Sequence, residues 1–309
     1  MSLERNILLW CSQNEWMKKN IPTYSFVKRA LKRFMPGERL EDALHESKRF
    51  NEYGIGTVLT HLGENINSLT EAASVTNHYL HVIDKIEEWN TPTEISLKLT
   101  QIGFDLSKEE TKKNFKMLAE KSIQKNNFVW IDMEQSNYVD STLQFYSEMK
   151  KLFNNTGVCV QAYLMRTKSD LINLADISPH IRLVKGAYKE PYSIAFKEKN
   201  KVDENYLELA KLLLDFVKNN NSRVAFGTHD MNIISKIETF GNSIGIDRKQ
   251  IEFQMLYGIR TSDQLRLVNE GYNVKVLISY GTAWYPWYVR RLAERPANVT
   301  FVLKNLFTK

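Results

Sequence analysis

Two adjacent arginines near the C-terminal end, Arg290 and Arg291, have the residue types and spacing to bind an anion. They lie between Pro286 and Pro296, which suit the first turn and the end of a short helix. On that helix Arg290 shares a face with Glu294, four residues later. The donor fork of arginine matches a carboxylate or phosphate; a solvated surface helix with an ordinary ion pair is the alternative. An anion-binding helix over a partly apolar pocket is favoured by its aromatic neighbours, Trp284, Tyr285, Trp287 and Tyr288.

A second set of polar residues lies in or just after short apolar runs. An unpaired buried charge costs several kcal/mol, so we expect Lys98, Asp132 and Arg182 to pair with one another or to face a polar ligand. A closed internal network of ion pairs is the alternative, but the surplus of cations favours an anionic ligand. The full set comprises Glu64, Lys98, Asp132, Gln161, Arg182, Lys185, Thr228, His229 and Gln254.

The elements that position these residues are eight β-rich runs that alternate with amphipathic segments. Their rhythm is typical of consecutive β-α units, and eight such units close a (β/α)8 TIM-type barrel, whose reacting groups lie at the C-terminal ends of the strands. An open doubly wound sheet is the competing architecture, but Gly54 and Gly56 precede the first run and no phosphate-binding glycine fingerprint follows it. The runs are 57–61, 95–99, 128–133, 158–163, 181–186, 223–229, 251–256 and 273–279, and the amphipathic segments include 112–124, 142–153, 206–218 and 233–240.

The first part of the chain reads as helices. We expect residues 1–50 to form an N-terminal helical extension and residues 51–309 to form the barrel, with no linker that divides the chain further. Residues 24–35 form a basic amphipathic segment. Such a helix packs on the body of the protein or lies on a membrane surface.

Composition excludes several classes of protein. The chain has 309 residues, 43% of them hydrophobic, a net charge of +6 and a pI near 9.0, which is too weak and scattered a charge for a nucleic-acid interface. No apolar run approaches ~20 residues, and no signal-peptide pattern is present. Two cysteines without a CxxC motif indicate a reducing compartment, so the expectation is a cytoplasmic protein.

Other chemistries fit the sequence less well. His78 and His81 have helical spacing but no further ligands, so no metal site is expected. Lys98 or Lys185 would suit a Schiff-base lyase, although that chemistry does not explain the paired arginines. Cys159 lies within an apolar run and reads as a small core residue.

With these residues assembled, the sequence resembles the proline dehydrogenase family from about residue 59 to 298. Any one of the shared motifs is weak, but their common order and spacing make the match specific. The motifs are Leu62-Gly-Glu64, Ser96-Leu-Lys98-Leu, Ile131-Asp132-Met133-Glu134, Val160-Gln161-Ala162-Tyr163, Arg182-Leu-Val-Lys185-Gly186-Ala187-Tyr188, Thr228-His229, Glu252-Phe-Gln254-Met-Leu-Tyr-Gly258 and Arg290-Arg291-Leu-Ala-Glu294-Arg-Pro296.

The resemblance implies a barrel that binds FAD and oxidises L-proline to Δ1-pyrroline-5-carboxylate, with hydride passing from C5 to flavin N5. It implies that Asp132 and Arg182 are the catalytic pair, with Arg182 near flavin N5. A cation there would stabilise the reduced flavin. The residues implied to hold the flavin are Met133, Gln161, Lys185, Gly186, Ala187, Thr228, His229 and Gln254.

The resemblance also implies a substrate site. Arg290 and Arg291 would clamp the proline carboxylate with help from Lys98, Glu294 would face the amine, and Glu64 would pair with Arg290 as a gate. The remaining residues implied to bind substrate are Tyr188, Leu277 and Trp287.

Leu277 and Trp287 depart from the family pattern, which usually has tyrosine at both positions. Both belong to the wall around the pyrrolidine ring, so the change favours altered affinity or a different cyclic amino acid as the alternative substrate. A Schiff-base lyase and a non-catalytic amino-acid-binding barrel are the other readings. The family further implies a quinone electron acceptor, and the basic segment at 24–35 would fit peripheral attachment to a membrane.

Overall fold

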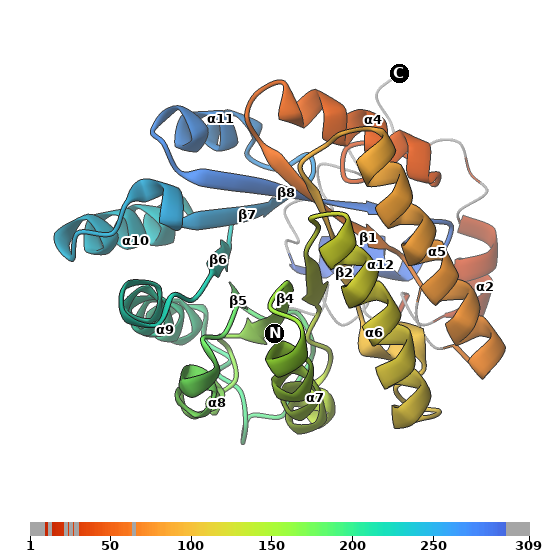
Figure 1. Cartoon of the computed structure of the whole chain (residues 1–309), viewed down its shortest axis with the longest axis horizontal. Helices are drawn as coiled ribbons and strands as arrows, with labels where there is room; N and C mark the ends of the chain where they lie inside the picture. The colour runs from red at the N-terminus through yellow and green to blue at the C-terminus, as the bar shows by residue number, and fades with distance from the viewer. Residues whose placement is uncertain are drawn as a thin grey trace.

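The computed structural model describes residues 10–11, 14–21, 24, 27, 31–63 and 66–294, and the side chains of residues 290–294 are not among those described. Eight parallel strands form a closed barrel in which each strand pairs with the next along the chain and β8 pairs with β1. Figure 1 shows the helices arranged around these strands. The predicted (β/α)8 barrel is therefore confirmed. The strands are β1 (Gly56–His61), β2 (Thr93–Leu97), β3 (Val129–Ile131), β4 (Thr156–Gln161), β5 (Ile181–Val184), β6 (Val224–Gly227), β7 (Glu252–Leu256) and β8 (Asn273–Tyr280).

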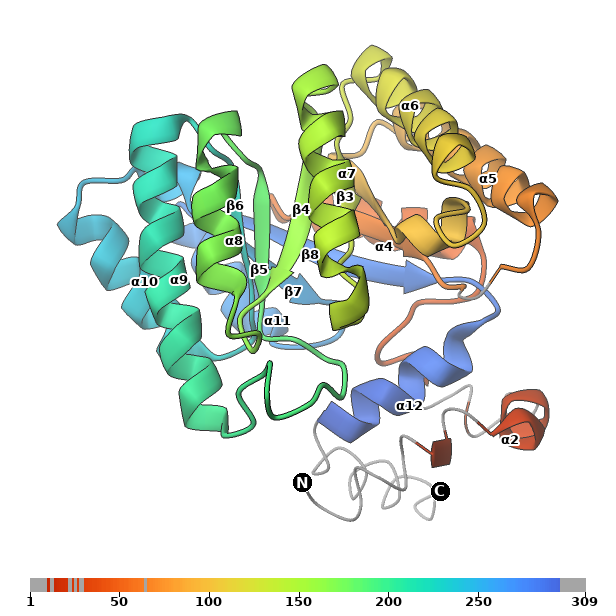
Figure 2. The same ribbon diagram turned by 90° about the horizontal axis from the view of Figure 1, so that it is seen from below.

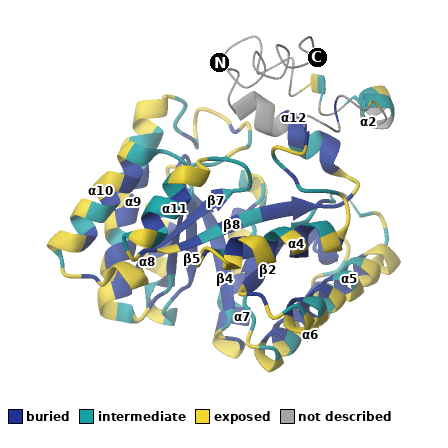
Figure 3. Ribbon diagram, turned by 90° about the horizontal axis from the view of Figure 1, so that it is seen from above, coloured by how far each residue is buried: buried dark blue, intermediate teal, exposed yellow. Residues whose placement is uncertain are grey.

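The helices cover the outside of the barrel, with buried inner faces and exposed outer faces (Figure 3). Local capping sets where several begin: Ser68 and Ser107 each accept a backbone N–H three residues later, and both helices carry glutamate in the first turn. The helices are α2 (Glu15–Asn20), α4 (Leu40–Asn51), α5 (Leu69–Glu88), α6 (Lys108–Gln124), α7 (Val139–Leu152), α8 (Thr167–Leu174), α9 (Lys199–Asn220), α10 (Met231–Ser243), α11 (Thr261–Asn269) and α12 (Trp284–Glu294), with 3-10 helices η2 (Leu99–Ile102), η3 (Ser136–Tyr138), η4 (Ala175–Ile177) and η5 (Arg248–Gln250).

Alternate residues of each strand face the helices and the barrel interior. Residues that face the helices, such as Leu59 and Ile95, belong to the large buried core between strands and helices. Val58, Trp130 and Ala225 form a separate buried cluster inside the barrel. The two-residue period therefore divides each strand into a packing face and an interior face, and the interior face carries the polar residues described below.

The helix predicted between the two prolines near the C-terminus is α12. Its residues Trp284, Tyr285, Tyr288 and Val289 are buried in a cluster with Leu62, which follows β1. Figure 2 shows α12 lying across one end of the barrel. Because α12 follows β8 and packs on the residue after β1, it lies at the C-terminal end of the strands.

The N-terminal segment packs against α12. Of the basic helix expected at 24–35, the structure describes residues 24, 27 and 31–35, and Val27, Leu31 and Met35 are buried in the cluster with α12. Gly258 lies so close to this segment that an added Cβ would be 1.7 Å from the backbone oxygen of Arg33. Three apolar residues of the segment are thus buried within the chain, Phe34 is half-buried and Tyr24 is exposed.

No helix in the described part of the chain has the length and apolarity needed to cross a membrane.

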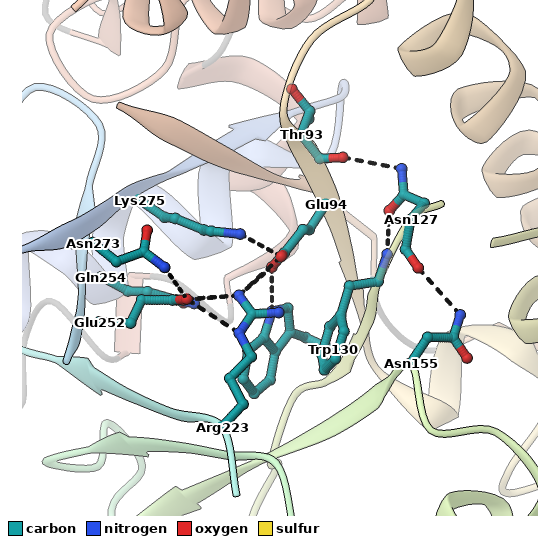
Figure 4. A network of polar contacts seen from close by, with 11 residues as sticks. Thr93, Glu94, Asn127, Trp130, Asn155, Arg223, Glu252, Gln254, Asn273 and Lys275 are labelled. Carbon is teal, nitrogen blue, oxygen red and sulfur yellow. Dashed lines mark hydrogen bonds and ion pairs between the residues drawn. The ribbon is translucent and has the colours of Figure 1, made fainter. Parts of the chain in front are cut away.

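The N-terminal end of the barrel interior holds a buried network of charges (Figure 4). Arg223 binds Glu94 at 2.8 Å and Glu252 at 2.7 Å, and Lys275 pairs with Glu94. Burial alone would raise the pKa of Glu94, but the charges of Lys275 and Arg223 lower it to about 2. Two cations and two carboxylates therefore form a closed set, which is the arrangement expected for buried charges. A closed network of ion pairs was the alternative expected for Lys98, Asp132 and Arg182. The network at this end of the barrel is of that kind, but its charged residues were not predicted as site residues.

His180 lies beside this network and gives a prediction for the pH dependence of stability. Its Nδ1 accepts a hydrogen bond from the backbone N–H of Arg223 at 3.1 Å, and burial, with Lys150 and Arg223 nearby, lowers the pKa of His180 to about 3. Between pH 6.5 and 3 the unfolded chain therefore binds a proton that the folded chain does not. We expect this histidine to lower the free energy of unfolding by about 1.4 kcal/mol for each pH unit below 6.5.

Urea unfolding of wild type and His180→Asn at several pH values between 7.5 and 5 tests this expectation. Asparagine keeps an acceptor oxygen but does not titrate, so the variant is expected to show a shallower loss of stability with falling pH. Parallel curves for the two proteins would contradict the assignment to His180.

Candidate functional site

The centre of the candidate site is a pair of opposite charges, Asp132 and Arg182, bridged by Ser96. Asp132 directly follows β3 and Arg182 lies in β5; Arg182 Nη1 is 3.4 Å from Asp132 Oδ1. Ser96 Oγ accepts a hydrogen bond from Arg182 Nη2 and donates one to Asp132 Oδ1, each at 2.9 Å. Lys98, Asp132 and Arg182 were expected to pair with one another or to face a polar ligand; Asp132 and Arg182 do pair, and the serine between them was not predicted as a site residue.

Trp130 separates this pair from the charge network at the other end of the barrel. The guanidinium carbon of Arg182 is 4.7 Å from the centroid of the indole ring and that of Arg223 is 5.1 Å away. The indole N–H donates to Glu94 at 2.8 Å. Because the indole is fully buried and hydrogen-bonded, it holds Arg182 at a defined height in the barrel by cation–π contact.

Several polar atoms in the barrel strands are buried without a hydrogen-bond partner in the described part of the chain. Three of them are Gln161 Oε1, Arg182 Nε and Gln254 Oε1, from β4, β5 and β7. The Gln254 amide nitrogen donates to Glu252 at 2.6 Å, and since a carboxylate only accepts, the amide oxygen is left over. Buried polar atoms in folded proteins are normally satisfied. The three atoms therefore indicate a site for a polar ligand.

Lys185, which follows β5, is held by two carboxylates. Its Nζ is 2.5 Å from Asp203 Oδ1 and 3.1 Å from Asp230 Oδ2. Burial would raise the pKa of Asp230, but Lys185 and Lys199 lower it. An ammonium group bound by two carboxylates is an electrostatic anchor, which disfavours Lys185 as the amine nucleophile of a Schiff-base lyase.

The segment after Lys185 is shaped by close backbone contact. Gly186 has φ +109°, and an added Cβ would be 2.2 Å from the ring of Tyr163, so glycine is required here. Ala187 is exposed and Tyr188 half-buried. These residues follow β5, so they lie at the same end of the barrel as Gln161, the last residue of the neighbouring parallel strand β4.

The predicted residues after β6 and β3 also lie at this end. His229 Nε2 accepts the backbone N–H of Leu256 at 2.9 Å, and Thr228 Oγ1 accepts that of Asp230 at 3.2 Å. Met133 is buried, with 6% of its surface exposed. Thr228 and His229 thus stabilise the backbone around the site through hydrogen bonds of their own.

Lys98 and the loop after β1 are joined by Gln101. The Gln101 amide oxygen accepts the backbone N–H of Lys98, and its amide nitrogen donates to the backbone oxygens of His61 and Gly63 at 2.9 and 2.8 Å. Gly63 directly precedes Glu64, which lies outside the described residues. The end of β2 therefore fixes the start of the segment that carries the expected gate.

Two of the residues predicted to bind the substrate, Leu277 and Trp287, lie in different parts of the barrel. Leu277 is half-buried and packs on the interior cluster that contains Trp130, and Trp287 packs on the cluster around α12. The backbone of α12 carries Arg290, Arg291 and Glu294 at the C-terminal end of the strands, but their side chains lie outside the described set.

Of the two candidate metal ligands, His78 has other partners. Its Nε2 is 2.8 Å from the hydroxyl of Tyr280, and its ring lies at 45° to that of His61, with the ring centroids 4.4 Å apart. Burial, with His61 and His81 nearby, lowers the pKa of His78 to about 4. Within the described ranges, no group of three or more His, Cys, Asp or Glu side chains is arranged to hold a metal ion.

The chain is similar to known proline dehydrogenases over its whole length. Residues 43–304 match the family model described as Proline dehydrogenase. Proline dehydrogenase 1 of Bacillus subtilis is 38% identical over 305 residues, which is 99% of each chain, and the proline dehydrogenase of Deinococcus radiodurans is 34% identical over 89% of each.

A solved structure shares the fold. The model superposes with a TM-score of 0.82 on the proline utilization A protein of Bdellovibrio bacteriovorus, inactivated by N-propargylglycine; the match is 23% identical and covers 96% of this chain and 39% of that longer one. The fold agrees, and the family model and the curated relatives match nearly the whole chain. This chain therefore belongs to the proline dehydrogenase family, a family of enzymes that oxidise proline.

Proposed function

We propose that this chain catalyses the FAD-dependent oxidation of L-proline to Δ1-pyrroline-5-carboxylate, the first step of proline catabolism. The observation that carries the proposal is the cluster of Asp132, which follows β3, with the buried side chains of Ser96 and Arg182 inside the barrel. The C-terminal end of β3, where Asp132 lies, belongs to the end of a (β/α)8 barrel where reacting groups are found. The cluster supplies a fixed cation and a fixed carboxylate, and Arg182 Nε is buried without a hydrogen-bond partner in the described part of the chain.

The described residues fit FAD. The unpartnered Gln161 Oε1, Arg182 Nε and Gln254 Oε1 suit the mixed donors and acceptors of a flavin edge. Lys185 directly follows β5, and the backbone at Gly186 next to it offers close approach. When bound, FAD would accept the hydride equivalent at N5. The full set that we propose to hold it is Met133, Gln161, Lys185, Gly186, Ala187, Thr228, His229 and Gln254.

Within this proposal the chain's own residues bind and orient the substrate. Asp132 and Arg182 fix the charges around the reacting atoms, and a cation near the flavin stabilises its reduced, more negative form. Arg290 and Arg291 clamp the proline carboxylate with Lys98, Glu294 faces the amine and Glu64 closes the gate with Arg290. The proposed wall of the ring pocket is formed by Tyr188, Leu277 and Trp287.

The proposed electron acceptor is a quinone, and we propose that residues 51–309 hold both the cofactor and the substrate. Peripheral contact with an anionic membrane is part of the same proposal. The support for it is charge: Lys32 and Arg33 are exposed, whereas the apolar residues Val27, Leu31 and Met35 of that segment are buried in the cluster with α12. Sedimentation with anionic liposomes at low salt tests the contact, and failure to sediment would exclude it.

The visible spectrum of the purified protein, before and after anaerobic addition of L-proline, tests the proposed function. We expect flavin bands that bleach with proline. Bands that persist with proline but bleach with another cyclic amino acid would assign the difference to Leu277 and Trp287. A colourless protein that takes up no added FAD would overturn the proposal.

A further inference from the structure

We infer that Ser96 is a positioning residue for the reaction proposed above: its hydroxyl keeps the Arg182 guanidinium and the Asp132 carboxylate apart, so that Arg182 stays directed at the ligand. The inference rests on the proposed function for its kinetic consequences. Its geometric consequence does not depend on a cofactor and can be tested separately.

The chemistry of the three groups settles the direction of both hydrogen bonds. A guanidinium only donates and an ionised carboxylate only accepts, so the Ser96 hydroxyl accepts from Arg182 and gives its single proton to Asp132. Both bonds are 2.9 Å long, whereas the direct Nη1–Oδ1 distance between Arg182 and Asp132 is 3.4 Å. The serine thus makes closer polar contacts with each charge than the charges make with each other.

Ser96 is itself held rigidly. Its side chain is fully buried on the interior face of β2, and its backbone oxygen accepts a hydrogen bond from the hydroxyl of Tyr79 at 2.9 Å. The same tyrosine hydroxyl accepts the backbone N–H of His61 at 3.1 Å. Ser96 is therefore anchored through α5 to the end of β1, so its hydroxyl has a fixed position between the two charges.

The bridge determines which donors of Arg182 remain for a ligand. With Ser96 present, Nη2 binds the serine, Nη1 faces Asp132, the guanidinium carbon is 4.7 Å from the centroid of the Trp130 ring and Nε has no partner in the described chain. Without the hydroxyl, arginine and aspartate at this distance are expected to close into a direct bidentate pair. Closure would turn the guanidinium away from the ligand and reduce the positive charge felt there.

The test compares Ser96→Ala with Thr57→Val. Thr57 is a matched control because it is buried on the neighbouring strand β1 and its hydroxyl is bonded to Thr93 at 2.8 Å, away from Asp132 and Arg182. For Ser96→Ala we expect kcat with proline to fall about 10- to 100-fold with a small change in KM, since one hydrogen bond to each of two charged groups is lost. We also expect a more negative midpoint potential of the bound flavin. Thr57→Val is expected to leave both unchanged.

A crystal structure of Ser96→Ala gives the readout that needs no flavin. We expect the contact between Arg182 and Asp132 to shorten from 3.4 Å, and an unchanged distance would overturn the inference. Wild-type kcat and potential in Ser96→Ala, or equal losses in both variants, would overturn it as well. If wild type neither binds flavin nor oxidises proline, the proposed function fails, whereas the crystal structure still decides the role of Ser96.

Discussion

Replacing Arg182 with methionine is expected to lower kcat for proline oxidation about 100- to 1000-fold, the usual cost of removing one preorganised electrostatic group. Arg182 is 4% exposed, pairs with Asp132 and stacks on Trp130, so it is a cation fixed before the substrate arrives. Methionine fills much of the volume but has neither the charge nor the donors. Steady-state kinetics with proline and an artificial acceptor measure the effect.

Two further variants separate charge from geometry. Arg182→Lys keeps a cation but lacks the planar donor fork that contacts Ser96, Asp132 and Trp130 together, so we expect an intermediate loss of kcat. Arg248→Met removes an exposed guanidinium near the N-terminal end of β7 and is expected to be neutral. If Arg182→Met stays folded and retains kcat within about twofold of wild type, Arg182 is not part of the catalytic machinery.

The barrel was predictable because parallel strands that are buried on both faces appear in a sequence as short apolar runs. Element boundaries were less accurate. Lys98 and Asp132 were placed in strands but directly follow β2 and β3, where Lys98 is the N-cap of η2. Helices α6 and α9 begin earlier than predicted, since their first turns are polar and lack the apolar period, although Ser107 caps α6.

The pairing of Asp132 with Arg182 followed from the cost of burying either charge alone. Ser96 was overlooked as a site residue because a hydroxyl costs less to bury than a charge, so a serine inside an apolar run gives no comparable signal. Side chains two residues apart in a strand lie on the same face. Ser96 and Glu94, two and four residues before Lys98, therefore share the interior face of β2, and Glu252 shares a face of β7 with Gln254. The partners of Lys185 had no such signal, since Asp203 and Asp230 come from α9 and the N-cap of α10.

The charge network at the N-terminal end of the barrel gives the largest expected effect on stability (Figure 4). Arg223→Met leaves Glu252 and Glu94 buried, at 2% and 8% exposure, with a single cation, Lys275, between them. Breaking a buried pair in this way costs about 3–5 kcal/mol. We expect that loss in the free energy of unfolding, measured with urea. As a control, Arg266→Met breaks a partly exposed pair with Glu270 and is expected to cost no more than about 1 kcal/mol.

The double variant Arg223→Met with Glu252→Leu distinguishes a network from a set of independent contacts. It removes one charge of each sign and leaves Glu94 with Lys275 as an intact neutral pair. We therefore expect it to be less destabilised than the sum of the two single variants, because neither remaining charge lacks a partner. Simple additivity would show that Arg223 and Glu252 act separately. Because Trp130 contacts Arg223 on one side and Arg182 on the other, a network that holds this indole in place also supports the site above it.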